Sequence, residues 1–131
     1  MPSIFTKIIN REIPANIVAE DDRFIAFLDI NPLSIGHTLI VPKKEVDYFF
    51  DVDEGSLAAL MVFAKRVASA IKKSVKCKRV GVAVIGFEVP HAHLHLVPMN
   101  GMSDINFANP KLKLSKEEFE KVTNDIKGNL A

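Results

Sequence analysis

The chain has little of the residues on which several classes of protein depend. It contains one cysteine, Cys77, and no tryptophan. One cysteine excludes a disulfide within the chain and a zinc site built from paired thiolates, and it favours a reducing compartment. The first residues lack the apolar segment of a signal peptide, and no apolar run is long enough to span a bilayer. We therefore expect a cytoplasmic protein with no membrane partner.

Net charge is also nearly absent. Seventeen Lys and Arg against sixteen Asp and Glu leave a formal net charge of +1, which argues against binding of nucleic acid through a strong positive field. Seven basic residues and no acid lie between Gly55 and Phe87, but aromatic residues do not alternate with them as on a single-strand-binding surface. We interpret this run as the solvated face of a helix followed by a turn, and expect no nucleic-acid partner.

The chain does have enough apolar material for one folded domain. Hydrophobic residues make up 48% of its 131 residues and charged residues 25%. These proportions are typical of globular proteins and exclude disorder as the main state. We expect residues 1–131 to form a single domain.

Apolar spacing predicts the elements of this domain. Residues 4–13 are expected to form a helix that Pro14 ends, and short strands are expected over 18–20, 24–28 and 37–41. The clearest helix follows Asp53, a candidate N-cap. Its apolar stripe comprises Leu57, Leu60, Met61, Ala64, Val67, Ala68, Ile71 and Val75.

The remaining elements complete an α+β pattern. Residues 80–85 are nearly all apolar, which predicts a strand buried on both faces, and residues 91–98 predict a further strand. A capping box formed by Ser115 and Glu118 predicts a C-terminal helix over about 114–128. Strands close together in the sequence, with a helix set apart from them, favour an α+β domain with a mainly antiparallel sheet.

Three of the four histidines lie within the five residues His91–His95, at alternate positions. Side chains alternate along a strand, so the three imidazoles are expected on one face, with Cα atoms about 6.5–7 Å apart. Ala92, Leu94 and Leu96 would then point into the core. Such a row suits a nucleophile with orienting or proton-relaying groups beside it, because imidazole titrates near neutral pH and its two nitrogens can take separate roles.

Two other readings of the row stay open at this point. The histidines could be three surface residues that alternate by chance. They could also hold a metal ion, because two imidazoles two residues apart on a strand can share one, with His37 or Glu88 as a further ligand.

The histidine row also carries a resemblance to a known family. Residues 91–97, His-Ala-His-Leu-His-Leu-Val, resemble the signature of the histidine triad (HIT) nucleotide-binding proteins. Further blocks resemble the same family in the same order, namely residues 4–14, 20–22 with 27–32, and 36–43. The order and spacing are similar to those of the Hint-like branch, and the resemblance covers residues 3–98.

The resemblance implies a fold and an activity. It implies a five-stranded antiparallel sheet with one long helix, extended across a homodimer into a ten-stranded sheet. It also implies a hydrolase, without a cofactor or catalytic metal, that acts at the α-phosphate of purine nucleoside phosphoramidates or related nucleotide conjugates. By the family's pattern His93 would attack phosphorus and form a nucleotidyl-histidine, while His91 and His95 would serve in proton relay and phosphate contact.

The resemblance further implies a nucleotide pocket. Five apolar residues would line the base pocket, and for each of them core packing is the plainer interpretation. Asp29 would accept hydrogen bonds from the ribose hydroxyls, and an acid at that place after a strand has no helical or turn role. His37 matches a structural histidine of the family and stays outside the catalytic set. The five apolar residues are Ile4, Phe5, Ile13, Phe27 and Ile30.

The chain departs from the family's pattern at two places. Ser3 and Thr6 stand where some relatives carry the cysteines of a zinc site, so no such zinc is expected. Phe87 and Glu88 stand where relatives have an amide and a hydroxyl, and an asparagine of the relatives has no match in residues 80–85. Glu88 either points away from the phosphate or is held protonated as a catalytic acid. A catalytically weak nucleotide-binding regulatory dimer is therefore the alternative function.

Overall fold

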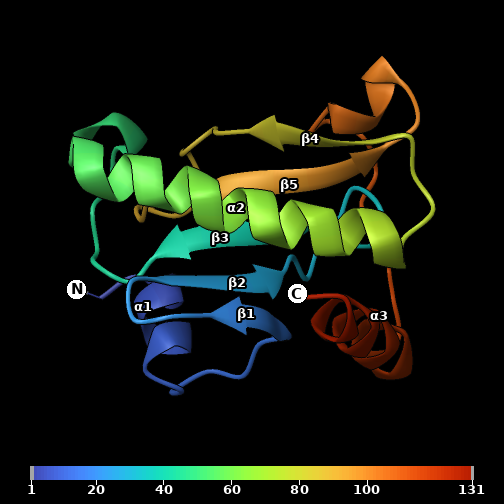
Figure 1. Cartoon of the computed structure of the whole chain (residues 1–131), viewed down its shortest axis with the longest axis horizontal. Coiled ribbons are helices and arrows are strands. Elements are labelled where there is room, and N and C mark those ends of the chain that lie inside the picture. The colour runs from blue at the N-terminus through green and yellow to red at the C-terminus, as the bar shows by residue number, and fades with distance from the viewer. Residues whose placement is uncertain (1, 131) are drawn as a thin grey trace.

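The computed structural model describes residues 2–130, so the first and last residues of the domain predicted over 1–131 lie outside the described residues. Its strands form one antiparallel sheet in the order β1-β2-β3-β5-β4 (Figure 1). The elements in chain order are α1 (Ile4–Ile9), β1 (Ile17–Glu20), β2 (Phe24–Leu28), β3 (Thr38–Pro42), η1 (Phe49–Asp51), α2 (Glu54–Ser74), β4 (Arg79–Ala83), β5 (Leu94–Met99), η2 (Met102–Ile105) and α3 (Lys116–Gly128). This arrangement confirms the predicted α+β fold with a five-stranded antiparallel sheet.

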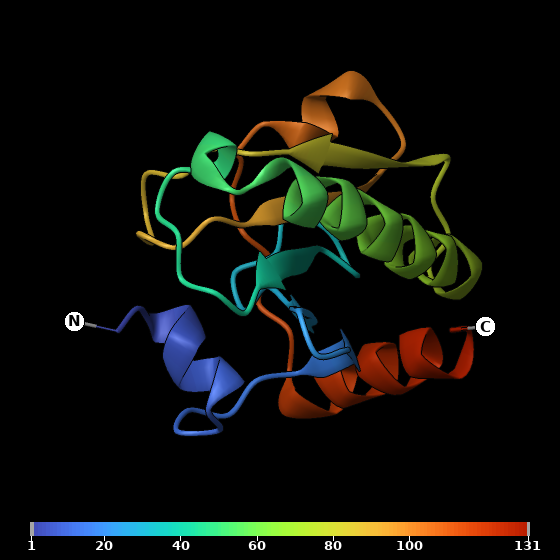
Figure 2. The same cartoon turned by 60° about the vertical axis from the view of Figure 1, so that its left-hand side comes forward.

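The two faces of the sheet are covered by different helices. Figure 2 shows α1 on one side of the strands and α2 with α3 on the other. Alternate residues of the buried strand β2 serve both sides: Phe24, Ala26 and Leu28 pack in the core with α2, while Ile25 and Phe27 pack in the core with α1. The long helix α2 thus covers one face of the sheet, and the face on the α1 side is left for other residues.

The long helix α2 begins where the sequence predicts, but its buried apolar stripe differs from the predicted one. Asp53 caps it by accepting a hydrogen bond from the backbone N–H of Ser56. Met61, however, is 45% exposed, whereas Phe63 and Ala70 are buried. The predicted stripe is thus correct except at Met61, and it omits Phe63, whose ring packs 5.6 Å from that of Phe24 on β2, and the small Ala70. The capping box of Ser115 and Glu118 is present at the start of α3.

The prediction that residues 80–85 form a strand buried on both faces is wrong. The strand β4 ends at Ala83 and forms an edge of the sheet, where it pairs with β5. Its apolar residues face solvent in part, with Val82 52% exposed. A run of apolar residues does not distinguish a central strand from an edge strand whose apolar surface is free in the isolated chain.

Three predicted boundaries also move, each through a backbone hydrogen bond. The helix predicted to run to Ile13 ends at Ile9, because Arg11 adopts a left-handed conformation with φ 63° and the N–H of Glu12 turns back to the carbonyl of Lys7. His37 precedes β3, since its N–H donates to Ser34 in a turn. The last strand, β5, begins at Leu94 rather than at position 91 because the N–H of Ala92 is bonded to Val46, outside the β3 and β4 ladders. No helix within residues 2–130 has the length and apolar character needed to cross a membrane.

Candidate active site

The histidine row lies on the α1 side of the sheet. The predicted alternation survives although β5 starts late, since Ala92, Leu94 and Leu96 belong to the core beneath α2. His91, His93 and His95 are buried on the opposite side, at 0%, 6% and 7% exposure. The interpretation of the row as surface histidines is therefore wrong.

His93, the middle histidine, has one nitrogen held and one free. Its Nδ1 lies 2.7 Å from the carbonyl oxygen of His91. A carbonyl oxygen only accepts hydrogen bonds, so Nδ1 carries the proton and Nε2 carries the lone pair. The rings of Phe5 and His95 pack edge-on against the imidazole, each with centroids 5.0 Å away. A neutral His93 thus presents a fixed nucleophilic nitrogen.

His91 is held at both nitrogens. Its Nε2 donates to the carbonyl oxygen of Pro42 at 2.7 Å, and its Nδ1 therefore accepts from the hydroxyl of Ser3, also at 2.7 Å. Burial lowers the pKa of His91, which favours the neutral ring. The residue does not line the cavity described below. It lies behind His93 and supplies the carbonyl that orients the His93 ring.

A carboxylate at the surface completes the contacts of His91. Glu45 Oε1 accepts hydrogen bonds from the backbone N–H of Ser3 at 2.7 Å and from the hydroxyl of Thr6 at 2.6 Å. These bonds, that of Thr6 first, lower the pKa of Glu45 to about 2. Ser3 also caps α1 through the N–H of Thr6. We call Ser3, Thr6, Glu45 and His91 the N-terminal clasp, because it ties the start of α1 to the triad.

The N-terminal clasp also tests the zinc that relatives hold near this end of the chain. The two hydroxyls of Ser3 and Thr6 are committed to an imidazole and to a carboxylate. Neutral hydroxyls are not the thiolate ligands on which a structural zinc site of this type depends. Ser3 and Thr6 therefore do not fit such a zinc, and hydrogen bonds join the start of α1 to His91 and Glu45.

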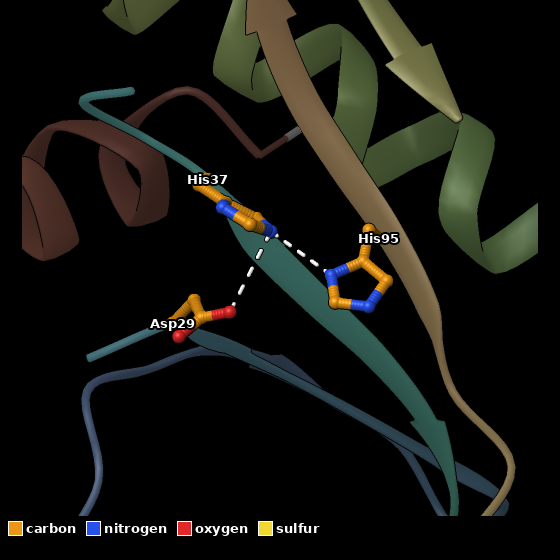
Figure 3. A group of neighbouring side chains, drawn as sticks. All are labelled: Asp29, His37 and His95. Atoms are coloured by element: carbon orange, nitrogen blue, oxygen red, sulfur yellow. Dashed lines mark hydrogen bonds and ion pairs between the residues drawn. The ribbon is translucent and has the colours of Figure 1, made fainter. Parts of the chain in front are cut away.

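His95 is held by a buried neighbour, His37 (Figure 3). The backbone N–H of Leu33 donates to His37 Nδ1 at 3.0 Å, so the proton of a neutral His37 is on Nε2. His37 Nε2 then donates to His95 Nδ1 at 3.0 Å, and His95 keeps its own proton on Nε2. Burial lowers the pKa of His37 to about 4. It also lowers that of His95 to about 3, where His37 and His93 add to the effect.

Asp29 lies beside His37 and His95, which together we call the buried pair. Figure 3 shows His37 Nε2 directed toward both His95 and Asp29, whose Oδ2 lies 3.6 Å away. Burial raises the pKa of Asp29, and the nearby charge of Glu88 adds to the rise. Asp29 Oδ1 accepts from the N–H of Asn31 at 2.8 Å. The expectation that Asp29 has no turn role is therefore wrong, because its carboxylate also closes a turn.

The spacing of this group would suit a divalent ion, but its hydrogen bonds favour another use. The donor atoms of Asp29, His37 and His95 all lie within 4.8 Å of one another. A histidine that binds a metal usually donates its other ring N–H to an acceptor. His37 Nδ1 instead faces a backbone donor, so a metal on Nε2 would require an anionic imidazolate. The geometry fits a chain of neutral hydrogen-bonded imidazoles better than a metal centre.

A cavity of about 220 Å³ brings the predicted residues together. Its wall includes His93, His95 and all six predicted nucleotide-binding residues, which are Ile4, Phe5, Ile13, Phe27, Asp29 and Ile30. Phe5 and Phe27 are also core residues, in edge-on contact at 5.4 Å. Ile4 and Ile30, at 48% and 68% exposure, are the exposed large apolar residues of the wall. The cavity is therefore apolar at its base and polar beside the histidines.

Glu88 satisfies neither prediction made for it in full. It is exposed, as expected of a loop residue that points away, yet it lines the same cavity as Asp29 and His93. The loop from Gly86 to Pro90 thus places a second carboxylate near the imidazoles.

Sequence reasoning missed two residues around the site. The ring of Phe107 packs edge-on against His95 with centroids 4.7 Å apart and against His37 at 6.0 Å. It lies outside every recognised motif, so no signal in the sequence indicated it. Glu45 follows the matched block that ends at Lys43, and only the folded chain brings it to Ser3.

An antiparallel sheet that carries a buried histidine row beside a small cavity defines a class of protein already suggested by the sequence. The model of the HIT domain matches residues 10–102 of the chain. An uncharacterized HIT-like protein of Borreliella burgdorferi is 34% identical over 97% of this chain and 97% of its own length. The chain belongs to the HIT family.

Solved structures agree with this membership. A hypothetical histidine triad nucleotide-binding protein from Sulfolobus tokodaii is 33% identical and superposes with a TM-score of 0.83 over 97% of this chain and 91% of its own. A HIT family hydrolase from Legionella pneumophila is 36% identical with a TM-score of 0.65, over 73% of this chain and 91% of its own.

Proposed function

We propose that the protein is a Hint-like hydrolase of purine nucleoside phosphoramidates or related nucleotide conjugates, with His93 as nucleophile. The observation that carries the proposal is the hydrogen bond from His93 Nδ1 to the His91 carbonyl, which leaves the lone pair on Nε2. Two similar structures, one of a hypothetical histidine triad nucleotide-binding protein and one of a HIT family hydrolase, support the same reaction class.

The first step exchanges one bond at phosphorus for another. His93 Nε2 attacks the α-phosphorus, the phosphorus–nitrogen bond of the substrate breaks, and its electron pair leaves with the amine nitrogen, which takes up a proton. We propose that a water molecule supplies that proton, and that Glu88, an exposed carboxyl group in the wall of the cavity beside His93, orients this water. The product is a nucleotidyl-His93 and a free amine.

The second step releases the enzyme. Water attacks phosphorus, the bond to Nε2 breaks, and the electron pair returns to His93. The proton of this water passes to solvent beside Glu88, and a nucleoside monophosphate departs. Splitting hydrolysis into two displacements in this way lowers the barrier of each step.

The flanking residues hold the reacting groups. His95 has a single proton, on Nε2, and loss of that proton would leave an imidazolate. Its role is therefore to donate a hydrogen bond to a phosphoryl oxygen as charge develops there. Asp29 accepts from the ribose hydroxyls, and the base enters the apolar end of the cavity.

Trapping of the intermediate tests the proposal. Wild-type protein mixed with adenosine 5′-phosphoramidate and quenched in alkaline denaturant, which preserves the phosphorus–nitrogen bond, is expected to gain the mass of one adenylyl group, on His93. His93→Ala should bind AMP in calorimetry yet lose the adduct and at least about 10³-fold in kcat. Glu88→Gln should slow turnover while retaining the adduct. A labelled residue other than His93, or unchanged turnover in His93→Ala, would contradict the mechanism.

A nucleotide-binding regulatory dimer with weak catalysis is the second candidate. Phe87 and Glu88, in place of an amide and a hydroxyl, favour it. It predicts AMP affinity with neither turnover nor an adduct in the same experiment.

We also propose a homodimer and a cytoplasmic location. The edge strand β4 has one edge that pairs with no other strand of residues 2–130 and an exposed apolar side chain, Val82, at 52% exposure; Val84, directly after the strand, is 37% exposed. Such an edge is suited to pairing with the same edge of a second copy. Light scattering should give about twice the 14.5 kDa chain mass, and Val82→Lys should reduce it to that of one chain. The cytoplasmic location rests on the single cysteine.

A further inference from the structure

A second cavity has His93 in its wall. Its volume is about 480 Å³, against about 220 Å³ for the nucleotide cavity. The two sets of lining residues have His93 in common and no other member. The proposed nucleophile therefore stands where two cavities of different chemistry adjoin.

The wall of the second cavity is aromatic. Its apolar side chains are Tyr48, Phe49, Phe50, Val84, Ile85 and Phe87. Phe50 packs edge-on against both Tyr48 and Phe49, with ring centroids at 5.8 and 5.6 Å. Phe87 and Phe50 are nevertheless 93% and 69% exposed. Arranged rings with this much free surface can bind another ring at little conformational cost.

The charges in this wall restrict what can enter. Apart from His93, its ionisable residues are Asp47 and Tyr48, and neither lysine nor arginine is among the lining residues. A leaving group with further phosphates, such as a second nucleotide, would bring negative charge toward Asp47 without a cation to meet it. A neutral or cationic group with an aromatic ring meets no such penalty.

We propose that this cavity binds the leaving group of the substrate, and that this leaving group is an amine that carries an aromatic ring. The inference rests on the proposed function, because it takes His93 as the residue that meets phosphorus. The nucleoside and the leaving group are both attached to that phosphorus. With the nucleoside in the 220 Å³ cavity, the other substituent extends along the wall formed by Phe50 and Phe87.

Two matched substrates test the inference. The adenosine 5′-phosphoramidates of 2-phenylethylamine and of ethylamine share the scissile bond and differ by a ring. Wild-type kcat/KM is expected to favour the phenylethyl substrate by about tenfold or more, the effect of burying one ring. Phe50→Ala and Phe87→Ala should each reduce that ratio toward one. Met102→Ala, a 92% exposed residue outside both cavities, is the control and should leave the ratio unchanged.

Binding separates this inference from the proposed function. In the His93→Ala background, calorimetry should still give tighter binding of the phenylethyl compound, and Phe87→Ala should remove the difference. Absence of turnover with that preference retained would overturn the hydrolase and leave the aromatic cavity standing. Equal affinity and equal kcat/KM for the two compounds would overturn the cavity proposal. So would variants that alter the mass measured by light scattering but leave the ratio intact, since the rings would then serve contact between copies.

Discussion

The outer histidines of the row, His91 and His95, are each held in one tautomer, but by different neighbours. His91 is held by the N-terminal clasp, whose carboxylate, Glu45, lies at the surface. His95 is held by His37, which is buried and neutral and is oriented by the backbone N–H of Leu33. Both arrangements fix which ring nitrogen carries the proton.

The difference shows where the site can tolerate change. In the N-terminal clasp the Ser3–His91 hydrogen bond is buried, but Glu45 lies at the surface, where water can replace a lost partner and solvent screens charge. At the His37 end, a lost donor leaves a buried nitrogen without a partner, which costs about 1–3 kcal/mol. The buried end should therefore be the more sensitive to mutation and to pH.

Replacement of His37 is expected to have the largest effect. His37→Ala removes the donor that fixes His95 Nδ1 as an acceptor, so His95 can place its proton on Nδ1 and turn a lone pair toward the phosphate. We expect kcat to fall by about 10²-fold, as on loss of one donor to developing charge. The cavity and the unpaired nitrogen should cost about 2–4 kcal/mol in the free energy of unfolding.

Steady-state kinetics and urea unfolding measure the two losses. His37→Gln, whose amide can donate to His95, should recover part of kcat. If His37→Ala retained wild-type kcat, His37 would have a structural role only, and the two ends of the row would not differ in their effect on catalysis.

The pH dependence of stability should also distinguish His37 and His95 from Glu45. His37 and His95 have folded-state pKa values of about 4 and about 3, below the ordinary 6.5. At pH values between the folded-state and the unfolded-state pKa, the unfolded chain thus binds more protons than the folded chain. The free energy of unfolding should therefore fall as pH drops from 6.5 toward 4. Each histidine can contribute up to about 1.4 kcal/mol per pH unit. The raised pKa of Asp29 acts in the opposite direction.

At the other end, the lowered pKa of His91 acts in the same direction as those of His37 and His95, whereas Glu45 should respond in another range. Glu45 has a lowered pKa, so its contribution is present above the unfolded value of 4.5 and is lost as pH falls through about 2. Urea unfolding of wild type and His37→Ala from pH 7 to 4.5 measures the difference. The variant should show a flatter dependence, and equal slopes would contradict the assignment of this window to the buried pair.

The same contrast separates what could be predicted from the sequence. The alternating histidines, the strand over 24–28 and the helix after Asp53 depend on local pattern, and the structure confirms them. The cavity residues came from resemblance to a family, and the fold brings them together. Local pattern and family motif were therefore sufficient for the sheet and for the row.

The partners that orient the row were not predictable in this way. Glu45 meets Ser3 across 42 residues, and His37 meets His95 across 58, so neither contact leaves a periodic signal. The apolar run at 80–85 was misread for a related reason, because its burial depends on whether another strand or another copy covers it. Long-range contacts decide these features, and a single sequence does not record them.

The smallest expected effect is at the N-terminal clasp. Ser3→Ala removes the hydroxyl that donates to His91 Nδ1, and Glu45→Gln keeps an oxygen acceptor for Ser3 and Thr6 while removing the charge. We expect a few-fold decrease in kcat for Ser3→Ala and less for Glu45→Gln, because His91 keeps its bond to Pro42 in both. Single-turnover kinetics measures each variant and the pair.

Non-additivity is the result that would tie this end to catalysis. If Glu45 acts on His91 through Ser3, the double variant should be no slower than Ser3→Ala alone, since the path is already broken. A structural contribution of Glu45 to α1 would instead appear as an independent loss of unfolding free energy with kcat unchanged. A decrease in kcat for Glu45→Gln larger than that for His37→Ala would reverse the comparison, since the exposed carboxylate would then control the nucleophile more strongly than the buried imidazole does.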